Sequence, residues 1–313
     1  MSPLNRLRLI QFGAGYNLPV HVAASHGGFA RHGLEVDVTY TPNSTFLADG
    51  LEAGDFEIGH TSADDVIAEV EGRTLGLTGG SDIFLFMGLH SGLLDLVGAP
   101  GSADIESFRG KSLAVDSKVT GFVFILEKML RMNGIGPDEY DLVEVGGWES
   151  RYRSLLDGTH AGTLLTEPFV GEAVEAGCHV VARGSEIMPV YQATCGAARR
   201  AWAKDNADTL VRYIRAYVEA TAWCFDPANR STCLELLAEK SGIEGRAAER
   251  TLAVLLDPEE GLYPRAELNV AGIGAALDLR AEMGHLATPV PPAEKYIDLT
   301  YHSKAVGPGE GEG

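Results

Sequence analysis

The chain has 313 residues, of which 45% are hydrophobic and 22% are charged, a composition ordinary for a folded protein with two modest cores. Its 44 acidic residues outnumber its 25 basic ones, and the formal net charge of -19 argues against nucleic acid or an anionic membrane as a partner. No apolar run approaches the length of a membrane span, so we expect no membrane insertion.

The first part of the chain alternates short apolar strands with polar loops and helices. Pro19 suits the first turn of a helix, where its missing N–H goes unused, and Gly33 ends that helix before an alternating strand. Loops that leave the carboxyl ends of parallel strands gather at one sheet edge, where ligands bind, so this stretch predicts one wall of a ligand site. We expect strands over 7–12, 34–40 and 56–58 and polar loops over 13–18, 41–44 and 59–62. One helix should begin near Pro19 and end at Gly33, and a further helix should end near Ala53.

The same plan recurs in the second part of the chain. Between the two parts, the apolar segment 83–97 is punctuated by glycines, which predicts strand segments that pass from one lobe to the other. The other expected elements are helices over 63–71 and 122–133, helices ending near 156 and 177, strands over 75–80, 112–115, 141–145, 161–165 and 178–182, polar loops over 116–121 and 146–150, a return segment over 191–195, and helices from 198 to 284.

These patterns predict an α/β protein with two lobes joined by two crossovers. We assign lobe I to residues 1–90 and 195–305 and lobe II to residues 91–194, with mostly parallel sheets flanked by helices. Residues 306–313 are low in complexity and rich in glycine, so a disordered tail is expected there.

The N-terminal residues and the cysteines suggest a compartment. The chain enters its first strand without an apolar leader segment, which favours a cytoplasmic protein; a periplasmic or lipid-anchored location is expected instead if a leader has been removed. The cysteines lie far apart and form no C-x-x-C pair, so we expect buried thiols rather than metal ligands or disulfides: Cys178, Cys195, Cys224 and Cys233.

The glycine loop at 13–18 begins like a dinucleotide fingerprint but has Leu18 in place of the third glycine. A helix N-terminus that meets a ligand oxygen is the better interpretation, with Tyr16 and Asn17 as contacts, and a tight turn that binds nothing is the alternative. No cofactor is expected. His21, His26 and His32 fall on different faces of one helix, so no metal site is predicted there.

Polar residues at the expected strand ends are the candidate ligand contacts. His60 should point into the cleft, either as a contact or as an acid or base, and Glu167 either caps the next helix or meets a ligand amine. Trp148 either stacks on a flat ring or plugs the space between lobes, and Lys118 is either a contact or a solvated charge. The predicted contacts are Tyr16, Asn17, Asn43, Ser44, His60, Thr61 and Asp82 on one wall, and Ser117, Lys118, Thr120, Trp148 and Glu167 on the other.

Four segments in this order resemble the type II periplasmic binding-protein fold, in the branch that binds nitrate, taurine, alkanesulfonates and thiamine-pyrimidine precursors. The segments are PVHVAASHGGFARHGLEVDV, LEAGDFEIGHTSADDV, DIESFRGKSLAV and LLDGTHAGTLLTEPFVGEAVEAG, and the resemblance covers roughly 7 to 222. This chain departs from the family in Glu57, where an Asp is usual, and in Ala161-Gly162-Thr163, where Val-Asp-Ala is usual.

The resemblance implies a protein that holds a small polar or aromatic acid, a sulfonate or a pyrimidine-type ligand between lobes that close by hinge motion, with an ABC permease as a partner if it is exported. Some cytoplasmic branches of the fold are enzymes. A decarboxylase-like or lyase-like catalyst, with His60 and Glu167 as acid and base, is therefore the alternative. Two enzymes of the fold are disfavoured. The pyrimidine synthase of thiamine biosynthesis has a cysteine-rich motif that is not present here, and the nucleophilic Cys of the sulfinate desulfinase would fall near Gly15. The identity of the ligand does not follow from the sequence.

Overall fold

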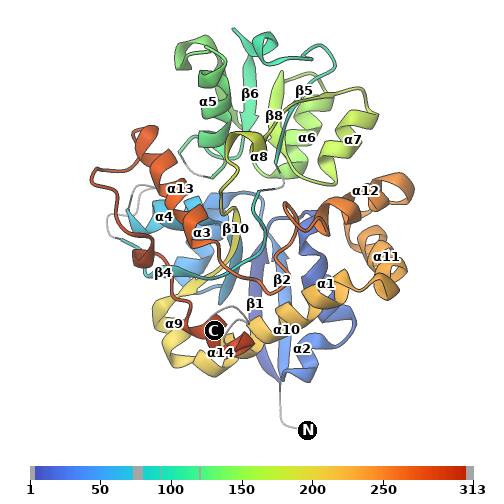
Figure 1. Ribbon diagram of the computed structural model, residues 1–313, viewed down its shortest axis with the longest axis vertical. Coiled ribbons are helices and arrows are strands. Elements are labelled where there is room, and N and C mark those ends of the chain that lie inside the picture. The colour runs from blue at the N-terminus through green and yellow to red at the C-terminus, as the bar shows by residue number, and fades with distance from the viewer. Residues whose placement is uncertain (1–3, 73–79, 93, 120, 308–313) are drawn as a thin grey trace.

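The computed structural model describes residues 4–72, 80–92, 94–119 and 121–307. It contains two five-stranded sheets, one in each lobe, which lie one above the other in Figure 1. The predicted two-lobed α/β fold is confirmed. The predicted tail beyond residue 307 and nearly all of the predicted strand over 75–80 lie outside the described residues.

The lobe I sheet has the order β2-β1-β3-β10-β4, and the lobe II sheet has the order β7-β6-β8-β5-β9. In each sheet one strand, β10 or β5, runs antiparallel to both of its neighbours, and the remaining neighbouring strands pair in parallel. The strands are β1 (Asn5–Gln11), β2 (Leu34–Tyr40), β3 (Ile58–Ser62), β4 (Ile83–Gly88), β5 (Asp95–Gly98), β6 (Ser112–Val115), β7 (Asp141–Glu144), β8 (Gly162–Leu165), β9 (His179–Arg183) and β10 (Thr194–Arg199).

The two reversed strands are the ones that enter a lobe from the other lobe. Strand β5 follows the first crossover from β4, and β10 follows the second crossover from β9. Because each arrives from the ligand edge of the sheet it joins, it must run against the strands whose carboxyl ends form that edge. The exact lobe boundaries at residues 90 and 194 stay predictions.

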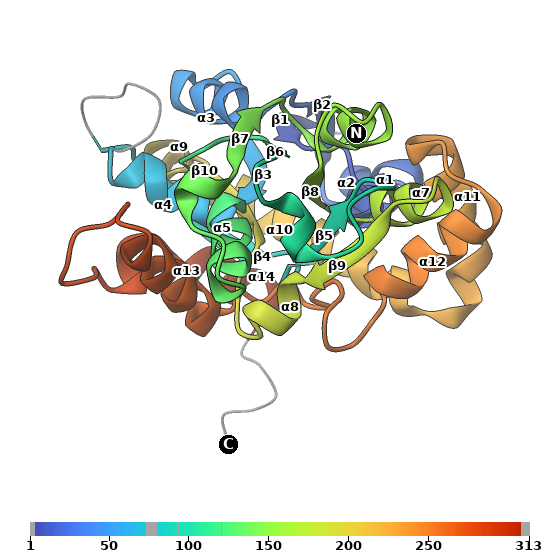
Figure 2. The ribbon, with the colours of Figure 1, turned by 90° about the horizontal axis from the view of Figure 1, so that it is seen from above.

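Helices cover both faces of each sheet. Figure 2 shows that α11 and α12 lie at one side of the molecule and α13 at the opposite side. The α-helices are α1 (Leu18–Ser25), α2 (Gly28–Arg31), α3 (Ser44–Ala53), α4 (Ala63–Val70), α5 (Val123–Met132), α6 (Trp148–Leu156), α7 (Phe169–Glu175), α8 (Gly184–Ile187), α9 (Arg200–Asp205), α10 (Ala207–Phe225), α11 (Arg230–Ser241), α12 (Gly245–Leu255), α13 (Val270–Glu282) and α14 (Thr300–Val306). Short 3-10 helices are η1 (Gly15–Asn17), η2 (Ile105–Phe108), η3 (Pro137–Glu139), η4 (Pro227–Asn229) and η5 (Ala293–Lys295).

The core of lobe I lies on both sides of strand β3. All five residues of β3 are buried, because β1 and β10 flank it in the sheet and helices pack on its two faces. Phe84 and Phe86 of β4 are also fully buried, and each such side chain contributes roughly 1.5–3 kcal/mol of transfer free energy. This packing gives the strand ends around the ligand edge a rigid support.

Several predicted element boundaries differ from the structure; β1 runs over Asn5–Gln11 instead of 7–12, and β10 runs to Arg199 where a helix was predicted from 198. Two further differences bear on the site. Strand β3 runs to Ser62, although the sequence suggested a loop from residue 59, because its residues pair with β1 on one side and β10 on the other. Helix α6 begins at Trp148, inside the predicted polar loop over 146–150. The bounds of β2 and β6 were predicted correctly.

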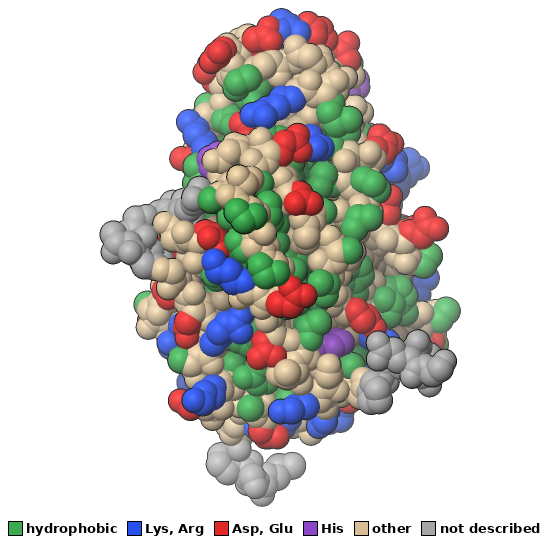
Figure 3. All heavy atoms as spheres, turned by 60° about the vertical axis from the view of Figure 1, so that its left-hand side comes forward, with side chains coloured by type: hydrophobic (Ala, Val, Ile, Leu, Met, Phe, Trp, Pro, Cys, Tyr) green, Lys and Arg blue, Asp and Glu red, His purple; other side chains and the backbone are tan. Residues whose placement is uncertain are grey.

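The surface is mixed in charge despite the excess of acid. Acidic and basic side chains are interspersed across the face shown in Figure 3. The four cysteines are buried free thiols, as predicted. Within the described ranges, no helix combines the length and the hydrophobicity needed to cross a membrane.

Candidate functional site

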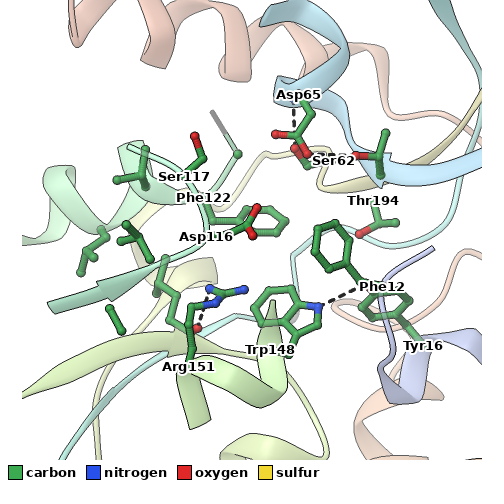
Figure 4. Close-up of a pocket in the computed structure, with 17 residues that line it drawn as sticks. Phe12, Tyr16, Ser62, Asp65, Asp116, Ser117, Phe122, Trp148, Arg151 and Thr194 are labelled. Carbon is green, nitrogen blue, oxygen red and sulfur yellow. Dashed lines mark hydrogen bonds between the residues drawn. The ribbon is translucent and has the colours of Figure 1, made fainter. Parts of the chain in front are cut away.

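A cavity lies between the two sheets, where the carboxyl ends of their parallel strands face each other. We call it the inner pocket; Figure 4 shows side chains from both lobes pointing into it. Its volume is about 40 Å³, counted as space open to the centres of water-sized atoms. It is lined by Phe12, Tyr16, Thr61, Ser62, Asp65, Ala114, Val115, Asp116, Ser117, Gly121, Phe122, Val123, Leu126, Trp148, Arg151, Leu164 and Thr194. The position is the one where ligands bind in open α/β sheets.

The lobe I wall carries a carboxylate at the start of helix α4. Ser62 caps this helix by accepting a hydrogen bond from the Asp65 amide at 3.1 Å, and Thr61 Oγ1 donates to Asp65 Oδ2 at 2.9 Å. The positive end of the helix dipole and the hydroxyl donor both favour the ionised carboxylate. Asp65 is therefore a fixed negative group at the edge of the pocket.

The lobe II wall carries a second carboxylate and a guanidinium. Asp116 follows β6 directly; its Oδ2 accepts the Ser44 amide at 3.2 Å, and its buried Oδ1 has no hydrogen-bond partner among the described residues. Arg151 is 5% exposed, and its Nη1 donates to the Leu164 carbonyl at 3.0 Å while its Nε has no partner there. Burial lowers the pKa of Arg151 to about 10, against the opposing effect of Asp116 and Tyr16, so the guanidinium stays charged near neutral pH.

Four aromatic rings close the pocket. The Arg151 guanidinium lies 4.1 Å from the centre of the Trp148 ring, and Phe122 and Phe12 lie 5.9 and 6.4 Å from it, centre to centre. Trp148 Nε1 donates to the Tyr16 hydroxyl at 3.4 Å. Burial raises the pKa of Tyr16 to about 12, so its hydroxyl keeps its proton and can donate it to a ligand. Flat walls of this kind suit a flat molecule.

Direct contacts hold the two lobes together around the inner pocket. The Gly147 amide of lobe II donates to the Pro42 carbonyl of lobe I at 2.9 Å, and the Gly121 amide donates to Asp64 Oδ2 at 2.8 Å. The Asp116 contact with the Ser44 amide also joins the lobes. The two lobes are therefore in direct contact around the inner pocket.

Four of the predicted contacts line the inner pocket: Tyr16, Thr61, Ser117 and Trp148. Their roles as ligand contacts stay predictions. Thr120, another predicted contact, lies outside the described residues.

The prediction that His60 points into the cleft is wrong. His60 is fully buried within β3, and its Nε2 lies 2.9 Å from the Tyr213 hydroxyl of α10. Side chains alternate along a strand, so the neighbouring Thr61 faces the pocket while His60 faces the helix behind the sheet. Burial lowers the pKa of His60 to about 3, so the ring stays neutral.

Five further candidates lie away from the inner pocket, because local structure uses their polar groups. Asn17 Nδ2 donates to the Phe12 carbonyl at 2.6 Å, and Asn43 caps α3 by accepting the Phe46 amide at 2.8 Å. Ser44 reaches the site only through its amide, which is bonded to Asp116. The Asp82 carboxylate accepts the Ala201 amide at the start of α9, and the exposed Lys118 donates through its amide to Glu144.

Glu167 lines a different cavity of about 730 Å³, which we call the crossover cavity because both crossovers contribute to it. Its carboxylate accepts a hydrogen bond from the Gly171 amide at 3.4 Å, which is the helix-capping role named as one of its two predicted roles. It also pairs with Arg250 of α12 at 3.1 Å. Burial raises the pKa of Glu167, and Arg250 opposes that shift. His60 and Glu167 therefore do not meet in one site, and the acid-base pair expected of an enzyme is not formed.

Two amides of the glycine loop donate to carbonyl groups of the protein. The Gly15 amide donates to the Glu167 carbonyl of lobe II at 3.2 Å, and the Asn17 amide donates to the Ala14 carbonyl at 3.2 Å. A Cβ on Gly15 would lie 2.6 Å from Thr251, so glycine allows this close approach. The tight-turn alternative describes this loop better than a ligand-binding helix end.

The charged residues of the inner pocket were not among the predicted contacts. Ser62 and Asp65 form an S-x-x-D pattern that is typical of a helix start, and it would have placed Asp65 at the strand end. Trp148 and Arg151 are three residues apart and share a face once α6 is known to begin at Trp148. The other missed lining residues with aromatic or polar side chains are Phe12, Asp116, Phe122 and Thr194. No cluster of three metal-binding side chains occurs among the described residues.

Comparison with known proteins identifies relatives of this chain. The family model described as the NMT1-like family matches residues 7–238. The bicarbonate transport ATP-binding protein CmpC of Synechococcus elongatus is 25% identical over 240 residues, which are 71% of this chain and 36% of CmpC. The chain therefore spans only about a third of the length of this curated relative.

Solved structures share the fold at low sequence identity. The nitrate-binding protein NrtA of Synechocystis PCC 6803 superposes with a TM-score of 0.82 at 13% identity, covering 97% of this chain and 89% of NrtA. The alkanesulfonate-binding protein SsuA of Xanthomonas axonopodis pv. citri, bound to MOPS, gives 0.74 at 15% identity, with 94% and 99% covered. At these identities the similarity establishes the two-lobed fold and leaves the ligand open.

Proposed function

Because this chain belongs to the NMT1-like family, we propose that it is a binding protein whose lobes close around one small, flat molecule that carries hydrogen-bond donors. The observation that carries this proposal is a pair of carboxylates, Asp65 and Asp116, in a cavity walled by aromatic rings. An amino-substituted nitrogen heterocycle has the matching chemistry.

Charge argues against a simple oxyanion as the ligand. Two carboxylates and one guanidinium are the charged side chains that line the inner pocket, which leaves it one net negative charge. Nitrate or a sulfonate would accept from Arg151 but would bring negative charge close to both Asp65 and Asp116, and such repulsion is strong in a poorly hydrated site. A ligand with an amino group pairs with the carboxylates instead.

Hydrogen bonding gives the ligand its expected polarity. Asp116 Oδ1 is a buried acceptor without a partner and Arg151 Nε is a buried donor without one. Buried polar groups without partners destabilise a protein, so a ligand that supplies both a donor and an acceptor binds favourably. The aromatic rings of Phe122 and Trp148 provide flat surface for a ring.

Entry requires the lobes to separate, because the inner pocket is closed and its walls come from both lobes. We place the hinge at the two crossovers, where the chain passes between the sheets. The relative CmpC, which this chain matches over part of its length, is named as a transport ATP-binding protein. On that basis we propose an ABC permease as the partner of the closed form.

Calorimetry with matched ligands tests the ligand class. Cytosine and uracil differ in whether an exocyclic amine donor or a carbonyl acceptor occupies one ring position, so cytosine should bind at least about tenfold more tightly. Asp116→Asn should reduce that preference, because the amide can donate to the uracil oxygen. Asp49→Asn, a change at an exposed residue of α3, is the matched control and should leave it unchanged.

The same titration includes nitrate, bicarbonate and MOPS. Tight binding of any of these by the wild-type protein, with no binding of cytosine, would overturn the proposed ligand class. Equal binding of cytosine and uracil would show that the carboxylates do not select for donors.

A further inference from the structure

A second cavity adjoins the inner pocket within the same interlobe cleft. We call it the outer chamber; its volume is about 370 Å³ by the same measure as the 40 Å³ of the inner pocket. It is lined by Phe12, Gly13, Ala14, His21, Tyr40, Thr41, Pro42, Gly147, Trp148, Glu149, Ser150, Pro168, Phe169, Lys240 and Ser241. Phe12 and Trp148 line both cavities, so these two side chains lie where the two cavities meet.

We infer that Trp148 is a specificity-determining residue that limits the ligand to a single ring by separating the inner pocket from the outer chamber. The inference rests on the proposed function, since it concerns the size of ligand that the same site accepts. It adds a second subsite, which is reached only when the indole is absent.

The position of the indole is fixed by contacts with the opposite lobe. Trp148 belongs to lobe II, but its Nε1 bonds to the Tyr16 hydroxyl of lobe I at 3.4 Å and its ring meets Phe12 of lobe I edge to face, 6.4 Å away. Arg151 covers the ring from the same helix at 4.1 Å. With these neighbours the side chain is 5% exposed and has little room to swing aside while the lobes are closed.

The backbone before Trp148 also depends on closure. The Gly147 amide donates to the Pro42 carbonyl at 2.9 Å, and a Cβ on residue 147 would lie 3.3 Å from that carbonyl oxygen and 3.5 Å from the Phe12 ring. Glycine therefore lets helix α6 approach lobe I closely enough for the indole to meet Phe12. The partition is complete only in the closed protein.

Part of the outer chamber is lined by polar side chains that suit a hydrophilic substituent. Burial, with a smaller effect of Lys240, lowers the pKa of His21 to about 4, so its ring is neutral at neutral pH and can accept or donate one hydrogen bond. The Tyr40 hydroxyl lies 3.5 Å from His21 Nε2, and the Lys240 ammonium adds a donor. A sugar, with several hydroxyl groups, fits this chemistry better than an apolar chain.

Cytosine and cytidine test the partition, because they share a ring and differ by a ribose. Trp148→Ala should raise the ratio of cytidine affinity to cytosine affinity by at least about tenfold over the wild-type protein, even if the loss of stacking weakens both. Trp148→Phe should give an intermediate ratio. Trp223→Ala is the matched control, since Trp223 packs on His26 in lobe I and lines neither cavity.

A crystal structure of the Trp148→Ala protein supplies a readout that needs no ligand. One continuous cavity is the expected result; collapse of Phe12, Phe122 or Phe169 into the space, with two cavities still apart, would overturn the inference. An unchanged affinity ratio in a protein that binds cytosine would overturn it as well. If the wild-type protein does not bind cytosine, the proposed ligand class fails, and the merged or separate cavities still decide the role of Trp148.

Discussion

Loss of one partner from the buried ion pair between Asp64 and Arg280 should strongly destabilise the protein. Arg280 Nη1 donates to Asp64 Oδ2 at 2.7 Å, and the two side chains are 0% and 2% exposed. The same carboxylate oxygen accepts the Gly121 amide of lobe II, and Arg280 Nη2 donates to the Val119 carbonyl at 3.3 Å. The pair therefore joins helices α4 and α13 of lobe I to the loop after β6 in lobe II.

Asp64→Asn keeps the size of the side chain and an acceptor for Gly121, but it leaves the Arg280 cation buried without a counter-charge. Removal of one partner of a buried pair destabilises a protein by about 3–5 kcal/mol, because the other charge stays desolvated. Replacing both partners, in Asp64→Asn with Arg280→Met, should recover most of that loss. Urea unfolding of the wild-type protein, Asp64→Asn, Arg280→Met and the double variant, followed by circular dichroism at about pH 7.5, gives the four free energies of a double-mutant cycle.

The ion pair between Lys128 of α5 and Glu282 of α13 is the matched control. It also joins the two lobes, at 2.6 Å, but its side chains are 25% and 49% exposed. Glu282→Gln should change the free energy of unfolding by no more than about 1 kcal/mol, because water screens the charges. The reasoning is refuted if Asp64→Asn is as mild as Glu282→Gln, or if the effects at positions 64 and 280 simply add. Small-angle scattering should show a larger radius of gyration for Asp64→Asn, since the contact with lobe II is weakened.

Burial raises the pKa of Asp95 from its ordinary 3.8 to about 6, so ionisation of this carboxyl disfavours the folded state as the pH rises through these two values. Asp95→Asn should therefore stabilise the protein by about 1–3 kcal/mol near neutral pH. Urea titrations should show that this stabilisation vanishes toward about pH 4. Burial lowers the pKa of His60 and His90 to about 3, so the unfolded chain binds protons at these residues before the folded protein does, and stability is lost as the pH falls below about 6.5. Replacing both residues by Gln should lessen the fall in melting temperature on acidification. An unchanged fall would contradict this account. Gly98→Ala should cost at least about 2 kcal/mol, because its Cβ would lie 1.9 Å from a backbone carbonyl oxygen, whereas Gly101→Ala, with nothing within 4 Å, should stay within about 0.5 kcal/mol in the same urea assay.

Part of the site could be found from strand ends alone. Tyr16, Thr61, Ser117 and Trp148 follow or close short strands, and the carboxyl ends of parallel strands meet at one edge, so the sequence was enough to bring them near a common cavity. His60 shows where that reasoning fails: β3 continues to Ser62, so His60 lies inside the strand, and alternation turns it away from the cleft that Thr61 faces.

The charged chemistry of the site depended on tertiary structure. Arg151 lies in a helix interior, and only the packing of α6 against β8 turns its guanidinium into a buried donor beside Asp116. The Asp64–Arg280 pair joins residues 216 positions apart, and no local pattern indicates such a partner. Each of these pairings lies within one lobe and follows from how helices and loops far apart in the sequence pack against each other.

The sequence by itself determined the two-lobed α/β fold, the bounds of β2 and β6, and the segments shared with relatives, because hydrophobic period and glycine placement act locally. Only the tertiary structure decided which side chains share the inner pocket, that its net charge is negative, and that Trp148 separates it from the outer chamber. Those properties arise from the approach of two surfaces, and each surface is complete only when the other lobe is present.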